Sequence, residues 1–86
     1  MIYLDLNGPE GNSFNIMSIA KKLCKALEID STPIINDMRS GDYEHLIDVF
    51  LKHFDAFVVL SREGHVISLA DRLVTNAEMQ EESIEN

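Results

Sequence analysis

The residues best placed for chemistry form the loop of residues 8–12 (GPEGN), which separates a strand-like stretch from a helix-like one. A glycine-rich loop between a strand and a helix has the geometry of phosphate-binding loops, in which free backbone N–H groups attract anions. Two features weaken this match, because Pro9 has no N–H group and Glu10 would repel a phosphate. The spacings of P-loops and dinucleotide loops are also missing. An anion- or nucleotide-binding site therefore stays an alternative to a tight turn, and its binding residues would be Gly8, Gly11, Asn12 and Ser13.

Three histidines invite a search for a metal site, but their spacing argues against one. His45 and His53 lie more than two turns apart in a helical pattern, so one ion could not bridge them. His65 lies in a predicted hairpin, and no pair has the four-residue spacing of helix-borne zinc sites. We therefore expect no metal and no other cofactor.

The possible nucleophiles are a single cysteine and several serines. Cys24 falls at the edge of an apolar helical stripe, where buried and unreactive thiols are common. The serines occupy expected caps and turns, and the sequence has no G-x-S-x-G motif. The carboxylates are those that caps and solvated helix faces normally contain. We therefore predict no catalytic residues and do not expect an enzyme.

The formal charge of −8 arises from 15 acidic and 7 basic residues in a chain of 86. Binding to nucleic acid or to an anionic membrane requires a basic surface, so we expect direct contact with neither. An acidic surface instead favours a protein partner with a basic surface. No basic leader precedes the first apolar stretch, so we expect a cytoplasmic protein.

Alternating apolar residues predict a first strand over residues 2–6, with its even-numbered residues facing a core. Apolar residues at helical spacing predict helices over residues 14–28, 33–39 and 43–54. Each helix is preceded by residues that favour a helix start. These start signals are Asn12 or Ser13, Thr32 with Pro33, and Asp42.

Two further strands are predicted over residues 57–60 and 65–69, where β-branched and aromatic residues dominate. A four-residue loop that ends at Gly64 would join them as a hairpin. Helical spacing then resumes, and residues 78–86 carry four Glu and no base, as a solvated tail does. We therefore predict a single compact domain over residues 1–77 and an acidic tail over residues 78–86.

The predicted fold belongs to the α/β (α+β) class. Its order is strand, helix, short helix, helix, strand, strand and helix, or β-α-α-β-β-α without the short helix. A right-handed crossover would place the first two strands parallel, with the helices mainly on one face. The hairpin would then add an antiparallel third strand, giving a small three-stranded mixed sheet.

The second face of this sheet is a candidate interface. If Phe57 and Val59 point at the helices, Val58 and Leu60 point away from them, beside Tyr3. An exposed apolar patch of this kind usually marks an interface or a covering element. We therefore expect Tyr3, Val58 and Leu60 to form a protein–protein surface, covered by the final helix or by a second copy in a homodimer.

Two stretches of the sequence carry a resemblance to known proteins, residues 4–14 (LDLNGPEGNSF) and residues 40–50 (SGDYEHLIDVF). They resemble a group of short, uncharacterised proteins of bacteriophages and prophages that open with an LDL-x-GPEGN-x-F motif. The motif carries no chemistry that could be transferred. The resemblance implies a context, since short phage proteins of this size commonly bind and redirect or inhibit a host or defence protein.

The sequence thus predicts a small acidic accessory protein, expected to be phage-encoded, that binds and modulates or inhibits a host or defence protein. A phage protein of this kind would act in the cytoplasm of the host cell. Besides the sheet residues, the candidate contact residues are Pro9, Glu10 and Gly11 in the loop, and Glu44 and Asp48 on the third helix.

Overall fold

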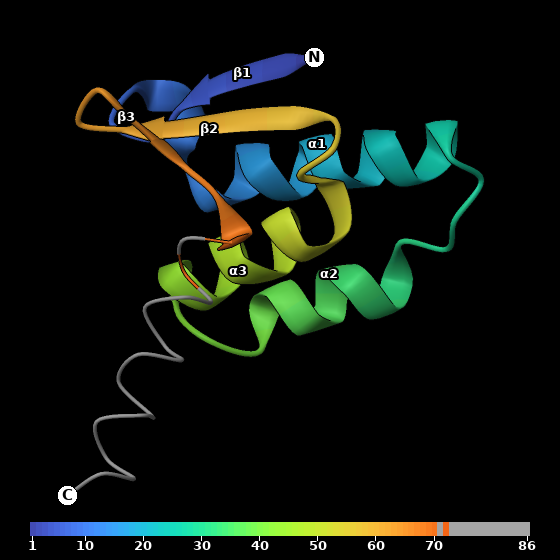
Figure 1. The fold of residues 1–86 in the computed structure, drawn as a ribbon. Helices are drawn as coiled ribbons and strands as arrows, with labels where there is room; N and C mark the ends of the chain where they lie inside the picture. The colour runs from blue at the N-terminus through green and yellow to red at the C-terminus, as the bar shows by residue number, and fades with distance from the viewer. Residues whose placement is uncertain (71, 73–86) are drawn as a thin grey trace, which may run out of the picture.

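The computed structural model describes residues 1–70 and 72 of the chain (Figure 1). Its elements are β1 (Ile2–Asp5), the 3-10 helix η1 (Pro9–Gly11), α1 (Ser13–Ala26), α2 (Thr32–Arg39), α3 (Tyr43–Phe54), β2 (Val58–Arg62) and β3 (His65–Ile67). This order confirms the predicted small α+β domain with a three-stranded mixed sheet. Leu69, Ala70 and Arg72 are helical. The rest of the predicted final helix and the tail of residues 78–86 lie outside the described residues.

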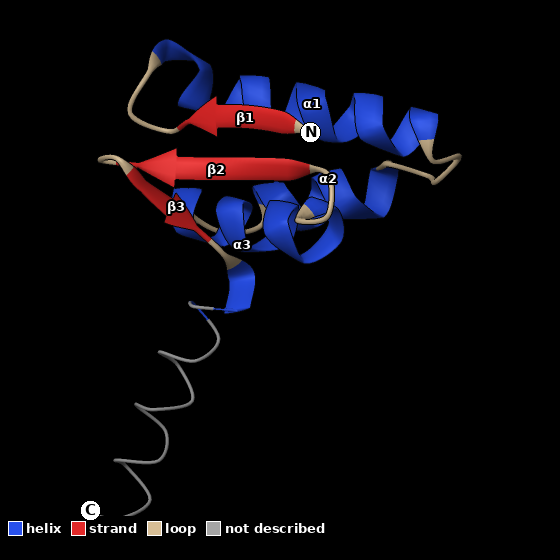
Figure 2. Cartoon of the chain, turned by 45° about the horizontal axis from the view of Figure 1, so that its top comes forward, coloured by secondary structure: helices blue, strands red, loops and turns tan. Residues whose placement is uncertain are grey.

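The sheet has the strand order β1-β2-β3, so β2 is its central strand. β1 and β2 are parallel, whereas β2 and β3 are antiparallel, as predicted. α1, α2 and α3 lie together on one face of the sheet (Figures 1 and 2). The long connection between the two parallel strands carries all three helices over that side. The opposite face has no helix on it in the part of the chain that the structure describes.

α1 and α3 begin at the residues that the sequence marks as starts, whereas α2 begins at Thr32, with Ser31 and not Thr32 at its N-cap position. The side chain of Asn12 accepts a hydrogen bond from Asn15 N at 2.9 Å and caps α1. Asp42 accepts one from His45 N at 2.9 Å and caps α3, whose bounds match the prediction. Pro33 lies in the first turn of α2, where its missing N–H group costs nothing.

The core lies between the three helices and the covered face of the sheet. Among the described residues, the buried side chains that form this core are all apolar. The largest fully buried side chains are Phe50, Phe54, Ile16, Met38, Ile47, Leu51, Leu60 and Cys24. Within the described part of the chain, no helix combines the length and apolar character needed to cross a membrane.

The prediction that Val58 and Leu60 point away from the helices is wrong. Both side chains are buried, with 4% and 0% of their surface exposed, whereas Val59 is half-buried on the opposite face. The register explains this, because Leu4 lies opposite Leu60 and paired residues of neighbouring strands point to the same face. Since Leu4 faces the helices, Leu60 faces them too. Val58 and Leu60 therefore belong to the core and cannot form the predicted surface.

The hairpin loop is also shorter than predicted. β2 continues through Arg62, which pairs with His65, so only Glu63 and Gly64 form the turn. Both turn residues have positive φ, 53° and 79°, as a type I′ turn requires. Glu seldom adopts this conformation, which is why the sequence favoured a longer loop. The side chain of Asn7 supports the turn by accepting a hydrogen bond from Glu63 N at 2.5 Å.

Candidate functional site

The loop of residues 8–12 uses its polar groups to hold its own shape. Gly8 and Gly11 both donate their N–H groups to backbone carbonyl oxygens within or just before the loop. The side chain of Asn12 takes the position at the N-terminus of α1 where an anion would bind, since it accepts from Asn15 N. These contacts favour a structural turn over the alternative anion- or nucleotide-binding site.

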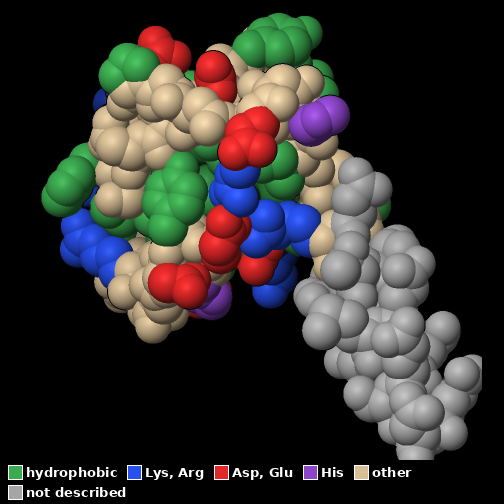
Figure 3. Space-filling model, turned by 90° about the vertical axis from the view of Figure 1, so that its left-hand side faces the viewer, with side chains coloured by type: hydrophobic (Ala, Val, Ile, Leu, Met, Phe, Trp, Pro, Cys, Tyr) green, Lys and Arg blue, Asp and Glu red, His purple; other side chains and the backbone are tan. Residues whose placement is uncertain are grey.

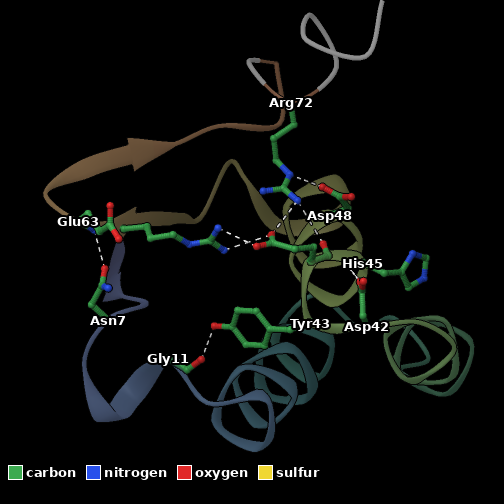
Figure 4. Close-up of polar contacts among 10 residues, drawn as sticks. Asn7, Gly11, Asp42, Tyr43, His45, Asp48, Glu63 and Arg72 are labelled. Atoms are coloured by element: carbon green, nitrogen blue, oxygen red, sulfur yellow. Dashed lines mark hydrogen bonds and ion pairs between the residues drawn. The ribbon is translucent and has the colours of Figure 1, made fainter. Parts of the chain in front are cut away.

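The candidate contact residues of this loop differ in how accessible they are. Pro9 and Glu10 are exposed, but Gly11 is buried. The hydroxyl of Tyr43 donates a hydrogen bond to the Gly11 carbonyl oxygen and ties α3 to the loop (Figure 4). Ser13 is half-buried in the first turn of α1. Gly11 therefore serves the fold, and only Pro9 and Glu10 are presented to a partner.

Glu44 and Asp48 point from α3 toward arginines of their own chain. Arg62 of β2 makes a two-pronged pair with Glu44, with N–O distances of 2.7 and 3.2 Å. Arg72 pairs with Asp48 and also reaches Glu44 at 3.1 Å (Figure 4). Acidic and basic side chains consequently gather side by side on this part of the surface (Figure 3). The predicted outer acids are therefore largely neutralised within the chain, which weakens their attraction for a basic partner.

Replacing Glu44 with Gln should make stability less dependent on pH. The hydrogen bond from Arg62 lowers the pKa of the Glu44 carboxyl below its ordinary value of 4.5, and Arg72 contributes further. A carboxyl with a lowered folded-state pKa stabilises the fold above its unfolded value, and this gain is lost as pH falls through the folded pKa. We expect the variant to be less stable at pH 7 by about 0.5 kcal/mol, because the pair is half-exposed.

When urea unfolding of both proteins is compared, the difference should shrink as the pH falls below 4.5 and through the folded-state pKa of Glu44. Asp55→Asn offers a control, since Asp55 is exposed at the end of α3. A difference between Glu44→Gln and the unchanged protein that stays constant as the pH is lowered from 7 to below 4.5 would contradict the ion pairing.

Ser40, His45 and Asp37 lie together between α2 and α3 but do not form a catalytic triad. His45 Nε2 lies 2.9 Å from Asp37 Oδ1 and 3.2 Å from Ser40 Oγ. A triad requires the two ring nitrogens to serve the two partners separately, whereas here one nitrogen faces both. The hydrogen bond with Asp37 raises the pKa of His45. This group therefore links two helices and does not activate the serine.

Cys24 is buried in α1, with 1% of its surface exposed. Burial raises the pKa of its thiol and the charge of Asp30 raises it further, so the reactive thiolate is disfavoured. No group of three or more His, Cys, Asp or Glu among the described residues is arranged to hold a metal ion. Among the described residues, Cys24 therefore serves as a packing residue of the core, and the acidic side chains of α3 serve in ion pairs.

The face of the sheet opposite the helices carries a row of apolar side chains, one from each strand. Tyr3 of β1 lies opposite Val59 of β2, and Val66 of β3 lies diagonally from Val59, because its direct partner is Ser61. We call these three residues the open apolar row. Tyr3 is 71% exposed and Val66 65% exposed. Sequence reasoning identified Tyr3 but missed Val59, because the facing of β2 was assigned the wrong way round, and it made no assignment for Val66 of β3.

Comparison of the chain with protein-family models, curated proteins and solved structures found no significant match. The geometry of the described residues is therefore the basis on which a function can be proposed.

The charges around the open apolar row are one-sided. Asp5 lies on the same face as Tyr3, two residues further along β1, and is exposed. Glu63 is exposed at the tip of the hairpin. Arg62 is the only Lys or Arg in the three strands, and it points to the other face to pair with Glu44. The open face thus combines apolar side chains with acidic groups and has no base from its own strands.

Proposed function

We propose that this protein is a small acidic accessory protein that works by binding another protein through the open face of its sheet. The resemblance to short phage proteins supports a cytoplasmic role in which it modulates or inhibits a host or defence protein. The open apolar row carries the proposal, because exposed apolar patches on a small sheet mark interaction sites.

The charges indicate what kind of partner would fit. Asp5 lies on this face, Glu63 is exposed at the tip of the hairpin, and the strands add no Lys or Arg to the face, so a partner with Lys or Arg around an apolar surface complements it. A second copy would bring the same acids and the same net charge of −8. A homodimer is therefore the less favoured occupant of the face. A nucleic acid or an anionic membrane would be repelled.

The proposal can be tested by placing a photo-crosslinking amino acid at Tyr3. The matched control places it at Phe14, which is 79% exposed on α1, away from the open face. We expect crosslinking in host lysate to give one protein adduct from position 3 and not from position 14. The adduct should disappear in a Val66→Ser variant, and high salt should reduce it because acidic groups border the face.

Two results would contradict this proposal. One is an adduct from both positions that Val66→Ser does not change, which would indicate unspecific contact. The other is an adduct that contains only a second copy of the protein, which would assign the face to self-association.

A further inference from the structure

We propose that the partner binds by adding an extended strand to the free edge of β1. This added strand carries an apolar residue and, two positions away, a Lys or Arg. This inference rests on the proposed function and specifies how the face is recognised. Strand addition of this kind draws affinity from main-chain hydrogen bonds and specificity from alternate side chains.

The backbone of β1 has its free hydrogen-bonding groups on the outer side. Ile2 N donates to Phe57 O at 2.9 Å, and Leu6 N donates to Ser61 O at 2.8 Å. These bonds direct the even-numbered residues of β1 toward β2. Because backbone groups alternate in direction along a strand, the N–H and C=O groups of Tyr3 and Asp5 point away from β2. The Asp5 carbonyl oxygen accepts a hydrogen bond from Gly8 N at 3.1 Å, so the groups left for an incoming strand are the N–H and C=O of Tyr3 and the N–H of Asp5. β1 is an outer strand (Figure 2), so these groups can pair with an incoming strand.

β1 lacks several of the features that commonly protect a sheet edge, although it is a short strand and carries Asp5. Its residues, IYLD, include no Pro and no Lys, and the pairing with β2 runs through all four positions without a bulge. The other edge, β3, is less suitable. β3 has three residues, and the chain becomes helical at Leu69 directly after it.

The side chains that border this edge determine what the added strand should carry. Tyr3 and Asp5 lie on the same face, so they would flank two residues of the partner strand that are also two apart. An apolar side chain beside Tyr3 and a cation beside Asp5 complement both. A second β1 would offer no cation to Asp5, which argues against pairing between two copies.

The experiment removes one outward N–H group without changing any side chain. Cys24 allows native chemical ligation of a synthetic segment of residues 1–23 to residues 24–86, so the natural sequence is kept. The variant carries N-methyl-Tyr3, and the control is the ligated protein without the methyl group. The melting temperatures should agree, because the Tyr3 N–H group does not face β2.

The probe is a seven-residue peptide, TKTVTKT, in which Lys lies two positions on either side of Val. Its control peptide, TETVTET, replaces both Lys with Glu. Titration followed by amide NMR should shift the signals of Tyr3 and Asp5, with the Glu peptide binding at least about tenfold more weakly. The N-methyl-Tyr3 protein should bind the Lys peptide more weakly than the control protein does, by a similar factor. Equal binding of both peptides, shifts confined to other residues, or equal binding by the N-methyl protein would overturn strand addition.

The crosslinked partner separates this inference from the proposed function. If that partner depends on Val66 yet binds the N-methyl-Tyr3 protein with unchanged affinity, the open face is the interface and strand addition is wrong. If no partner depends on Val66, the proposed function fails and the inference fails with it. A partner lost from both the Val66→Ser and the N-methyl protein supports both.

Discussion

Replacing Gly11 with Ala should lower the free energy of unfolding by about 3 kcal/mol or more. A Cβ atom at this position would lie 2.6 Å from Leu6 Cα and 2.7 Å from Leu6 C, and would also overlap the Leu6 carbonyl oxygen. These are backbone atoms of the residue that follows β1, so they cannot move aside as the tip of a flexible side chain can. Relief would require the loop to separate from the strand. That separation would also strain the hydrogen bond from Tyr43 to the Gly11 carbonyl oxygen.

Gly8 provides a matched control in the same loop. A Cβ atom there would have its nearest contact at 3.5 Å, which is ordinary van der Waals contact, and the φ of Gly8 is −87°. Gly8→Ala should therefore leave the free energy of unfolding within about 0.5 kcal/mol of its value in the unchanged protein. Urea unfolding of both variants, followed by circular dichroism, measures the contrast. Equal stability of Gly8→Ala and Gly11→Ala would contradict the close approach of Gly11 to Leu6.

The helical part of the fold could be predicted well because its signals are local. Asp42 caps α3, and the apolar spacing that follows it extends to Phe54, where the helix ends. The first strand likewise alternates as predicted, with Leu4 buried and Tyr3 exposed. Signals of this kind need only neighbouring residues, so tertiary context adds little to them.

The candidate site was harder to predict because its contacts join residues that are distant in sequence. In the sequence alone, Glu44 looks like an ordinary solvent-exposed acid of a helix. The fold places Arg62 and Arg72 beside it, although they are 18 and 28 residues away in the sequence. The facing of β2 depends in the same way on its register with β1. A stretch of apolar residues such as Phe57 to Leu60 is compatible with either facing, since both faces then look apolar. The register with Leu4 decides between them.

The corrected facing of β2 changes what each surface can do. With Val58 and Leu60 in the core, the open face presents three apolar side chains together with Asp5 and Ser61, which lie opposite each other. A small, partly polar face is poorly suited to a permanent dimer, whose interface resembles a divided core. It is better suited to a partner that adds main-chain hydrogen bonds to a few side-chain contacts.

Replacing Leu60 with Ala should lower the free energy of unfolding by about 3 kcal/mol, a large share of the stability of a domain of this size. Leu60 lies on the central strand with none of its surface exposed, so the variant would leave a cavity between the sheet and the helices. Val59→Ala, one residue away, should cost about 1 kcal/mol or less, because Val59 is half-buried on the open face. The effects on binding should have the reverse order. Val59→Ala should weaken the crosslink from position 3, whereas folded Leu60→Ala should retain it. Urea unfolding together with crosslinking yield measures both effects. A larger loss of stability for Val59→Ala than for Leu60→Ala would restore the original assignment of the two faces of β2 and remove the basis of the open apolar row.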